Sequence, residues 1–298
     1  MIPKDLFQKV RRIEITTSRM VTDVFAGQYH SVFKGQGIEF DEVREYQHGD
    51  DVRSIDWNVT ARTGRAHVKK FVEERELTVM IMVDVSRSCR FASVNMLKSQ
   101  LAAEISSLLA LAAIRNNDKV GLIIFTDQIE KFIPPKKGVR HVLRIIREVL
   151  YFEPKGRSTD VEAALQYLTR VGSRKTITFL ISDFFEPRAA EGQAAGLKTA
   201  LAITQRKHDL IPVTLNDPRE RTLPNCGLIG LEDAETGETF VVDSSDAAVR
   251  RQYENANRER VSRREKLFRS IGIDVIEVST EVPYADAIIK FFKKRQKR

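Results

Sequence analysis

Five oxygen-bearing side chains of this 298-residue chain follow segments that we expect to end at one edge of a sheet. Magnesium prefers a near-octahedral set of oxygen ligands, and carboxylates combined with serine and threonine hydroxyls supply such a set. None of the five is a histidine or a cysteine, which argues against zinc or copper. We therefore predict a site for Mg²⁺, with Mn²⁺ or Ca²⁺ as alternatives. Its ligands are Asp84, Ser86, Ser88, Thr159 and Asp183.

Residues of these types also follow strands for a purely local reason, because Asp, Ser and Thr cap helices and form turns. Capping accounts for Ser158 or Thr159 as readily as metal binding does. Asp160 suits the first turn of a helix, where a carboxylate interacts favourably with the helix dipole, better than it suits a metal. Capping explains all five positions together less well.

The elements that must position these residues alternate between strands and helices. The segment 77–85, LTVMIMVDV, is a nearly continuous apolar run, which is typical of a strand buried on both faces of a parallel sheet. Further strands are predicted at 120–125, 176–182, 209–215 and 273–278, with a hairpin partner at 128–133 and an edge strand at 240–242. Helices are predicted at 94–115, 138–151, 160–170, 188–206, 245–270 and 283–294. The alternation predicts a doubly wound, mostly parallel α/β sheet over 77–298, where ligands bind beyond the carboxyl ends of the strands.

The first 76 residues have a different pattern and are predicted to form a small N-terminal extension of helix and strands. Apolar residues recur at helical spacing over 1–30, whereas glycines and short extended pieces over 32–74 indicate strands and turns. Within the larger domain, 227–239 indicates a turn-rich β-hairpin inserted at the surface.

The bulk composition limits the functions to be considered. A net charge of +8 favours an acidic partner, and the basic excess lies in 250–266 and 290–298. Cys89 and Cys226 have no CxxC spacing, so neither a disulfide framework nor a zinc site is indicated. The N-terminus lacks an apolar signal core, and no apolar stretch approaches the roughly 20 residues of a membrane span. We expect a cytoplasmic protein.

The set Asp84-x-Ser86-x-Ser88, followed by Thr159 and Asp183, resembles the metal-ion-dependent adhesion site of von Willebrand factor A domains. The resemblance covers about residues 77–278 and implies a domain of that type. It also implies that a carboxylate of a partner protein takes the free position on the metal. Arg87 departs from the pattern, since adhesion-type sites usually have a small residue there. A cation at that place either lowers metal affinity or helps to recruit an acidic partner.

A second stretch, 35–76, resembles the signature of the bacterial family named domain of unknown function 58. In that family the signature precedes a von Willebrand factor A-like domain, as it does here. Members are associated with MoxR-type AAA+ ATPases in systems thought to remodel or mature other proteins, so the resemblance implies such an ATPase and a client as partners. The matching residues are Gly37, Glu39, Phe40, Arg44, Glu45, Tyr46, Gly49, Asp50, Arg53, Ile55, Asp56, Trp57, Ala61, Arg62 and Lys69.

Arginines and acidic residues alternate within this signature. Arg44, Arg53 and Arg62 are expected to pair with neighbouring carboxylates in a buried or half-buried lattice, and Trp57 is suited to anchor the extension on the α/β domain. The alternative is that these arginines, together with Arg87, form part of a partner-binding surface near the metal.

Three functions remain open on the sequence. The preferred one is a non-catalytic adaptor that couples a MoxR-type ATPase to its client, since the chain has no GxxxxGK[ST] nucleotide loop of its own. The second is a Mg²⁺-dependent hydrolase, for which no general base is evident among the five scattered histidines. The third is a polyanion- or RNA-binding protein that uses the basic helix and tail.

Overall fold

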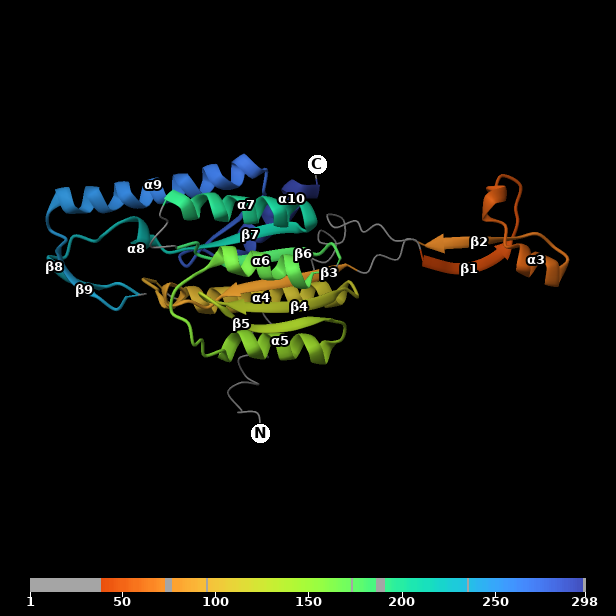
Figure 1. Cartoon of the computed structure of the whole chain (residues 1–298), viewed down its shortest axis with the longest axis horizontal. Helices are drawn as coiled ribbons and strands as arrows, with labels where there is room; N and C mark the ends of the chain where they lie inside the picture. The colour runs from red at the N-terminus through yellow and green to blue at the C-terminus, as the bar shows by residue number, and fades with distance from the viewer. Residues whose placement is uncertain are drawn as a thin grey trace, which may run out of the picture. The chain divides into compact units, whose positions relative to one another are not determined.

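The computed structural model describes residues 39–72, 77–94, 96–172, 174–185, 191–234 and 236–296. The helix expected over 1–30 lies outside these residues. The described chain divides into two compact units, one within Phe33–Leu77 and one that contains Thr78–Arg298 (Figure 1).

The smaller unit pairs two strands around a short helix. β1 (Glu39–Glu45) runs antiparallel to β2 (His67–Val72), and the turn η2 (Val52–Ser54) and helix α3 (Trp57–Thr63) lie between them. The prediction of strands and turns alone was wrong for α3. The helix begins there because the Asp56 carboxylate accepts hydrogen bonds from two first-turn amides, and it ends at Gly64, whose φ of 72° suits glycine.

The larger unit is built on a six-stranded sheet, and the predicted mostly parallel α/β sheet is confirmed. The strand order is β10-β7-β6-β3-β4-β5, and every neighbouring pair is parallel except β4 and β5. The central strands carry almost uninterrupted buried side chains, as strands covered on both faces must. The strands are β3 (Thr78–Asp84), β4 (Lys119–Phe125), β5 (Ile129–Lys136), β6 (Ile177–Ser182), β7 (Asp209–Asn216) and β10 (Ile276–Ser279).

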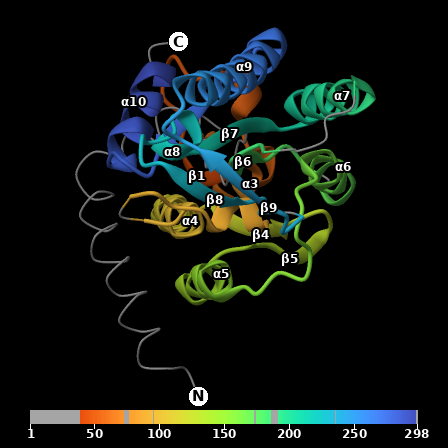
Figure 2. The same cartoon turned by 90° about the vertical axis from the view of Figure 1, so that its left-hand side faces the viewer.

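Helices cover both faces of this sheet (Figure 2). One face packs against α6, α7 and α9, whose apolar residues form a core with Met82, Leu180 and Leu210. The opposite face carries α4, α5 and α10. Their bounds are α4 (Lys98–Arg115), α5 (Val139–Tyr151), α6 (Val161–Val171), α7 (Glu191–Lys207), α9 (Ala247–Ile271) and α10 (Tyr284–Gln296), and the short α8 is Pro218–Arg221.

Two expectations about element positions were wrong. The segment predicted as an edge strand, β9 (Thr239–Asp243), pairs with β8 (Leu228–Glu232) in a separate two-stranded sheet, so the hairpin is longer than 227–239. Helix α4 begins at Lys98 rather than near residue 94, because Leu97 is still extended. This later start places Lys98 in the first turn.

The strand order places a topological switch point between β3 and β6. The chain leaves β3 toward β4 and β5, then returns to the other side of β3 to form β6 and β7. In open α/β sheets, ligands bind outside the carboxyl ends of the strands at such a point. Asp84 ends β3 and Asp183 directly follows β6, so two of the predicted ligands lie there.

Candidate functional site

Asp84 is the centre of a hydrogen-bonded turn at the end of β3. Its Oδ1 accepts the backbone N–H of Ser86 at 2.9 Å, and its Oδ2 accepts the hydroxyl of Ser182 at 2.6 Å. The Ser86 and Ser88 hydroxyls lie 3.0 Å apart, and Ser88 also bonds to Asp183. All of these side chains are buried. The structure therefore brings together four of the five predicted ligands.

Asp183 is held by a cation that the sequence did not reveal. The Nζ of Lys98 lies 2.6 Å from Asp183 Oδ2 and 2.5 Å from Glu220 Oε1, and the lysine side chain is 0% exposed. A lysine near the start of a predicted helix carries no sequence signal for burial, and Glu220 lies 122 residues further along the chain. Lys98, Asp183 and Glu220 come together only because α4 and α8 pack around the end of β6.

Cys89 also lies in the cluster, which corrects the expectation of an all-oxygen environment. Its Sγ and one carboxylate oxygen each from Asp84 and Asp183 lie within 4.8 Å of one another, and the thiol is buried. Burial, together with the negative charges of the two aspartates, raises the pKa of the Cys89 thiol. The side chain is thus held in its neutral form, in which it is a weak ligand. The position of Cys89 directly after Ser88 was the sign in the sequence that this residue would lie near the site.

Thr159 lies in a loop that is fastened beside the Ser86–Ser88 turn. The backbone N–H of Arg87 donates to the carbonyl of Arg157 at 3.1 Å, and Asp160 N–H donates to Thr126 O at 3.0 Å. The Thr159 hydroxyl is buried and has no hydrogen-bond partner among the described residues. A buried hydroxyl normally finds a partner, so this one is suited to an incoming ligand. Asp160, predicted to lie in the first turn of a helix, is instead the N-cap of α6 and accepts the N–H of Ala163.

Gly156 sets the path of the Thr159 loop. Glu130 Oε1 accepts the backbone N–H groups of Lys155 and Gly156, and a Cβ at Gly156 would collide with the Thr126 and Asp127 side chains. The loop therefore runs flush against the end of β4, and only a glycine allows this approach.

We expect Gly156→Ala to displace this loop and weaken metal binding about tenfold or more, a change of ~1.4 kcal/mol. The displaced loop moves the Thr159 hydroxyl away from the aspartates. Titration of Mg²⁺ by calorimetry measures the effect, with Gly230→Ala, which has open space around it, as the matched control. If Gly156→Ala bound Mg²⁺ as tightly as Gly230→Ala, the result would show that Thr159 is not a ligand.

The cluster brings several ionisable side chains together around Asp84 and Asp183. Burial, followed by the negative charge of Asp183, raises the pKa of Asp84 to about 7. Burial alone would also raise the pKa of Asp183, but the ammonium of Lys98 outweighs it and holds that pKa below its ordinary value. Asp84, Asp183 and Glu220 are three carboxylates facing one ammonium. When all are ionised, these four groups carry two net negative charges, and the guanidinium of Arg264, which interacts with Asp183 and Glu220, offsets part of that charge.

The donor set fits a divalent metal on these grounds. Two carboxylates and two serine hydroxyls meet in one buried cluster, the hydroxyl of Thr159 has no described partner, and the net charge is complementary. Hard oxygen ligands of this kind suit Mg²⁺, Mn²⁺ or Ca²⁺.

Helix α9 contacts the segment that directly follows β6 and contains Asp183. Arg264 Nη1 donates to the carbonyl of Asp183 at 3.0 Å, and the Arg260 guanidinium lies 4.9 Å from the ring centroid of Phe185. Phe184 has a positive φ of 54° and packs edge-to-face on Phe268 of α9. A bulky residue in this conformation is strained, so the packing of α9 is what holds the loop after β6.

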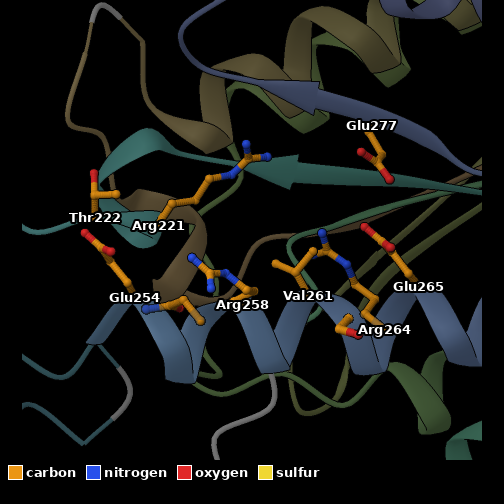
Figure 3. A pocket seen from close by; sticks show the side chains of 10 residues that line it. Arg221, Thr222, Glu254, Arg258, Val261, Arg264, Glu265 and Glu277 are labelled. Carbon is orange, nitrogen blue, oxygen red and sulfur yellow. The ribbon is translucent and has the colours of Figure 1, made fainter. Parts of the chain in front are cut away.

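A surface pocket of about 490 Å³, lined in part by Arg264, lies between the end of α8, one face of α9 and β10 (Figure 3). Arginines and glutamates line it together, and neither Arg221 nor Arg258 forms an ion pair among the described residues. Its lining is Arg221, Thr222, Glu254, Asn257, Arg258, Val261, Ser262, Arg264, Glu265 and Glu277.

Comparison with known proteins places the chain in a family. The family described as "Protein of unknown function DUF58" matches residues 42–263, about three quarters of the chain. The chain belongs to the DUF58 family. Uncharacterized proteins of Mycobacterium bovis and Mycobacterium tuberculosis are each 28% identical to it over 290 residues, which cover 97% of this chain and 89% of theirs.

Two solved structures are similar to this DUF58 chain at low identity. The conserved hypothetical protein BatB from Bacteroides thetaiotaomicron has a TM-score of 0.47 and 17% identity, covering 74% of this chain and 100% of its own. An aerotolerance-related membrane protein from Bacteroides fragilis has a TM-score of 0.46 and 16% identity, covering 74% of this chain and 98% of its own. In the part of this chain that the structure describes, none of the helices combines the length and apolar character of a membrane span.

Among the described residues, the DUF58 signature forms the predicted arginine–carboxylate pairing only in part. Arg44 pairs bidentately with Asp50 at 2.7 and 2.8 Å, but Arg53 and Arg62 are exposed and form no ion pair among the described residues. The reason is that Asp51 and Asp56 are used as caps of η2 and α3. Trp57 is 67% exposed, so it does not belong to the interior of the small unit. Its role in anchoring the extension on the α/β domain stays a prediction.

Three of the four described histidines have partners away from the cluster, and the fourth, His48, is exposed. His141 Nε2 bonds to the carbonyl of Val120, His67 Nδ1 lies 3.1 Å from the Thr63 hydroxyl, and His208 Nδ1 lies 2.9 Å from that of Thr176.

At least one basic residue of the C-terminal segments forms ion pairs within the protein, since Arg295 pairs with Asp209 and Asp274.

Proposed function

We propose that this DUF58 protein is a non-catalytic interaction module with a domain of the von Willebrand factor A type. A divalent metal bound by Asp84, Ser86, Ser88, Thr159 and Asp183 would join it to a partner. The metal's role is to offer a coordination position to a carboxylate of that partner. The partners we propose are a MoxR-type AAA+ ATPase and a client protein.

The observation that supports this most is the cluster at the switch point. Four of the five ligands predicted from the sequence lie in one buried, hydrogen-bonded group at the ends of β3 and β6. Local capping does not account for this arrangement, because Asp84 and Ser182 pair across two strands that are 98 residues apart in the sequence. Asp84 and Asp183 are buried carboxylates that repel each other, which is unfavourable in the interior unless a cation or a proton joins them.

The chain's own residues would do two things in binding. The Ser182 hydroxyl and the Ser86 amide fix the orientation of the Asp84 carboxylate. The basic surface of the protein, with a net charge of +8, would attract an acidic partner and make the association sensitive to salt.

The test is a binding measurement between the full chain and the purified MoxR-type ATPase of the same organism. We expect the affinity to fall about tenfold or more, ~1.4 kcal/mol, when EDTA replaces Mg²⁺. Asp183→Asn should show the same loss in the presence of Mg²⁺, whereas Asp286→Asn, an exposed carboxylate of α10, should not. Metal-independent binding would contradict the role of the metal, and absence of binding under all conditions would contradict the partnership.

A further inference from the structure

The most unusual group beside the candidate site is the ammonium of Lys98. A lysine is almost never fully buried unless it is paired, and this side chain is 0% exposed. It also lies in the first turn of α4, where the positive end of the helix dipole disfavours a cation. The fold therefore keeps this charge where two separate effects oppose it.

Lys98 divides its charge between two carboxylates from different elements. Asp183 follows β6 and is a proposed metal ligand, whereas Glu220 belongs to α8. Glu220 is only partly exposed, at 19%, and its other oxygen accepts the N–H of Asp217 at 3.3 Å. The ammonium thus has a second anionic partner ready if Asp183 is taken by another cation.

A divalent ion and the ammonium would both require Asp183. The Lys98 ammonium, 2.6 Å from Asp183 Oδ2, occupies one of the two oxygens of this carboxylate and adds one positive charge beside the proposed metal ligands. Two cations that share one buried carboxylate repel each other strongly. Either the affinity for the metal is lowered by the lysine, or the lysine moves toward Glu220 when the metal binds.

We propose that Lys98 competes with the metal for Asp183 and so sets the metal affinity of the site. This inference rests on the proposed metal site. If Lys98 moved toward Glu220 when the metal binds, the change would reach α8, which contains Glu220. Arg221 of the same helix lines the pocket against α9. Lys98 is then a positioning residue that tunes the site without touching the partner.

The test is calorimetric titration of Mg²⁺, and separately of Mn²⁺, into the full chain. Lys98→Met removes the charge with a similar shape. Lys98→Gln also removes the charge but retains an N–H donor, and it serves if the methionine variant does not fold. We expect each to bind the metal about tenfold or more tightly than the wild type. Lys136→Met, which removes an exposed lysine at the end of β5, should leave the affinity unchanged.

The double substitution tests the coupling to α8. We expect Glu220→Gln to weaken metal binding while Lys98 is present, because the ammonium then depends on Asp183 alone. In the Lys98→Gln background the same change should have a clearly smaller effect, since only its general electrostatic contribution remains. Melting curves provide a second readout: without metal the Lys98 variants should melt below the wild type, and Mg²⁺ should raise their melting temperature more than it raises that of the wild type.

The outcomes separate this inference from the proposed function. Metal binding by Lys98→Gln but not by the wild type would support the competition directly. Equal affinities in the wild type and both Lys98 variants would overturn the inference and leave the metal site in place. If none of these proteins bound metal, the metal part of the proposed function would fail and the inference with it.

Discussion

Asp84→Ala is expected to abolish saturable Mg²⁺ binding, with a loss of affinity of about a hundredfold or more, ~2.7 kcal/mol. Asp84 is one of the two carboxylates among the proposed ligands and is fully buried, so its removal halves the anionic ligands of the metal. A hard divalent cation is not held by hydroxyls alone. The measurement is calorimetric titration of Mg²⁺ into the wild type and the variant.

Thermal melting gives an independent check of the same prediction. A ligand that binds only the folded protein stabilises it by about 2.7 kcal/mol at a concentration a hundred times its dissociation constant. Mg²⁺ should therefore raise the melting temperature of the wild type and leave that of Asp84→Ala unchanged. Asp286→Ala, which removes an exposed carboxylate, is the control and should behave as the wild type. Undiminished binding by Asp84→Ala would rule out the proposed site.

Asp217→Ala is expected to cause the largest loss of stability among substitutions near the site. This buried carboxylate accepts four hydrogen bonds: from the N–H and hydroxyl of Ser93, from the hydroxyl of Thr280 at 2.7 Å and from the N–H of Arg219 at 2.9 Å. It therefore joins the loop before α4, the start of α8 and the turn after β10. Each buried donor left without a partner costs ~1–3 kcal/mol, so we expect a loss of at least about 3 kcal/mol.

Chemical denaturation of Asp217→Ala and of a matched variant, Asp246→Ala, measures this effect. Asp246 also caps a helix, α9, through the N–H of Ala248, but it is exposed and accepts no bond across the fold. Its replacement should cost only ~1 kcal/mol, the ordinary value of a helix cap. Similar losses in the two variants would show that Asp217 acts only as a cap.

The same carboxylate predicts a dependence on pH. Burial alone would raise the pKa of Asp217, but the hydrogen bonds from Ser93, Arg219 and Thr280 outweigh it and hold the pKa below its ordinary value. A lowered pKa in the folded state means that the stabilisation is present above the unfolded value of about 4 and is lost as the pH falls through the folded value. The stability difference between the wild type and Asp217→Ala should therefore shrink below about pH 4.

The sequence predicted the sheet well because its central strands have a pattern that few other structures produce. The apolar runs that became β3 and β6 are buried on both faces, and such runs between amphipathic helices indicate a parallel sheet. It predicted α3 poorly, because glycines nearby suggested turns and the cap formed by Asp56 was read as part of an ion-pair lattice. The partners of an aspartate in a loop depend on which backbone amides come close, and spacing does not show this.

The sequence by itself determined which strand ends carry the oxygen-bearing side chains that we propose as ligands. Asp84 and Asp183 end neighbouring parallel strands, and the carboxyl ends of such strands must meet at one edge, so their proximity follows from the pattern. Only the tertiary structure decided the charge around them. Lys98 and Cys89 lie beside Asp183, and Glu220 pairs with Lys98, because α4, the turn after β3 and α8 pack against one point. Contacts between residues far apart in the chain depend on this packing, and no periodicity of the sequence encodes them.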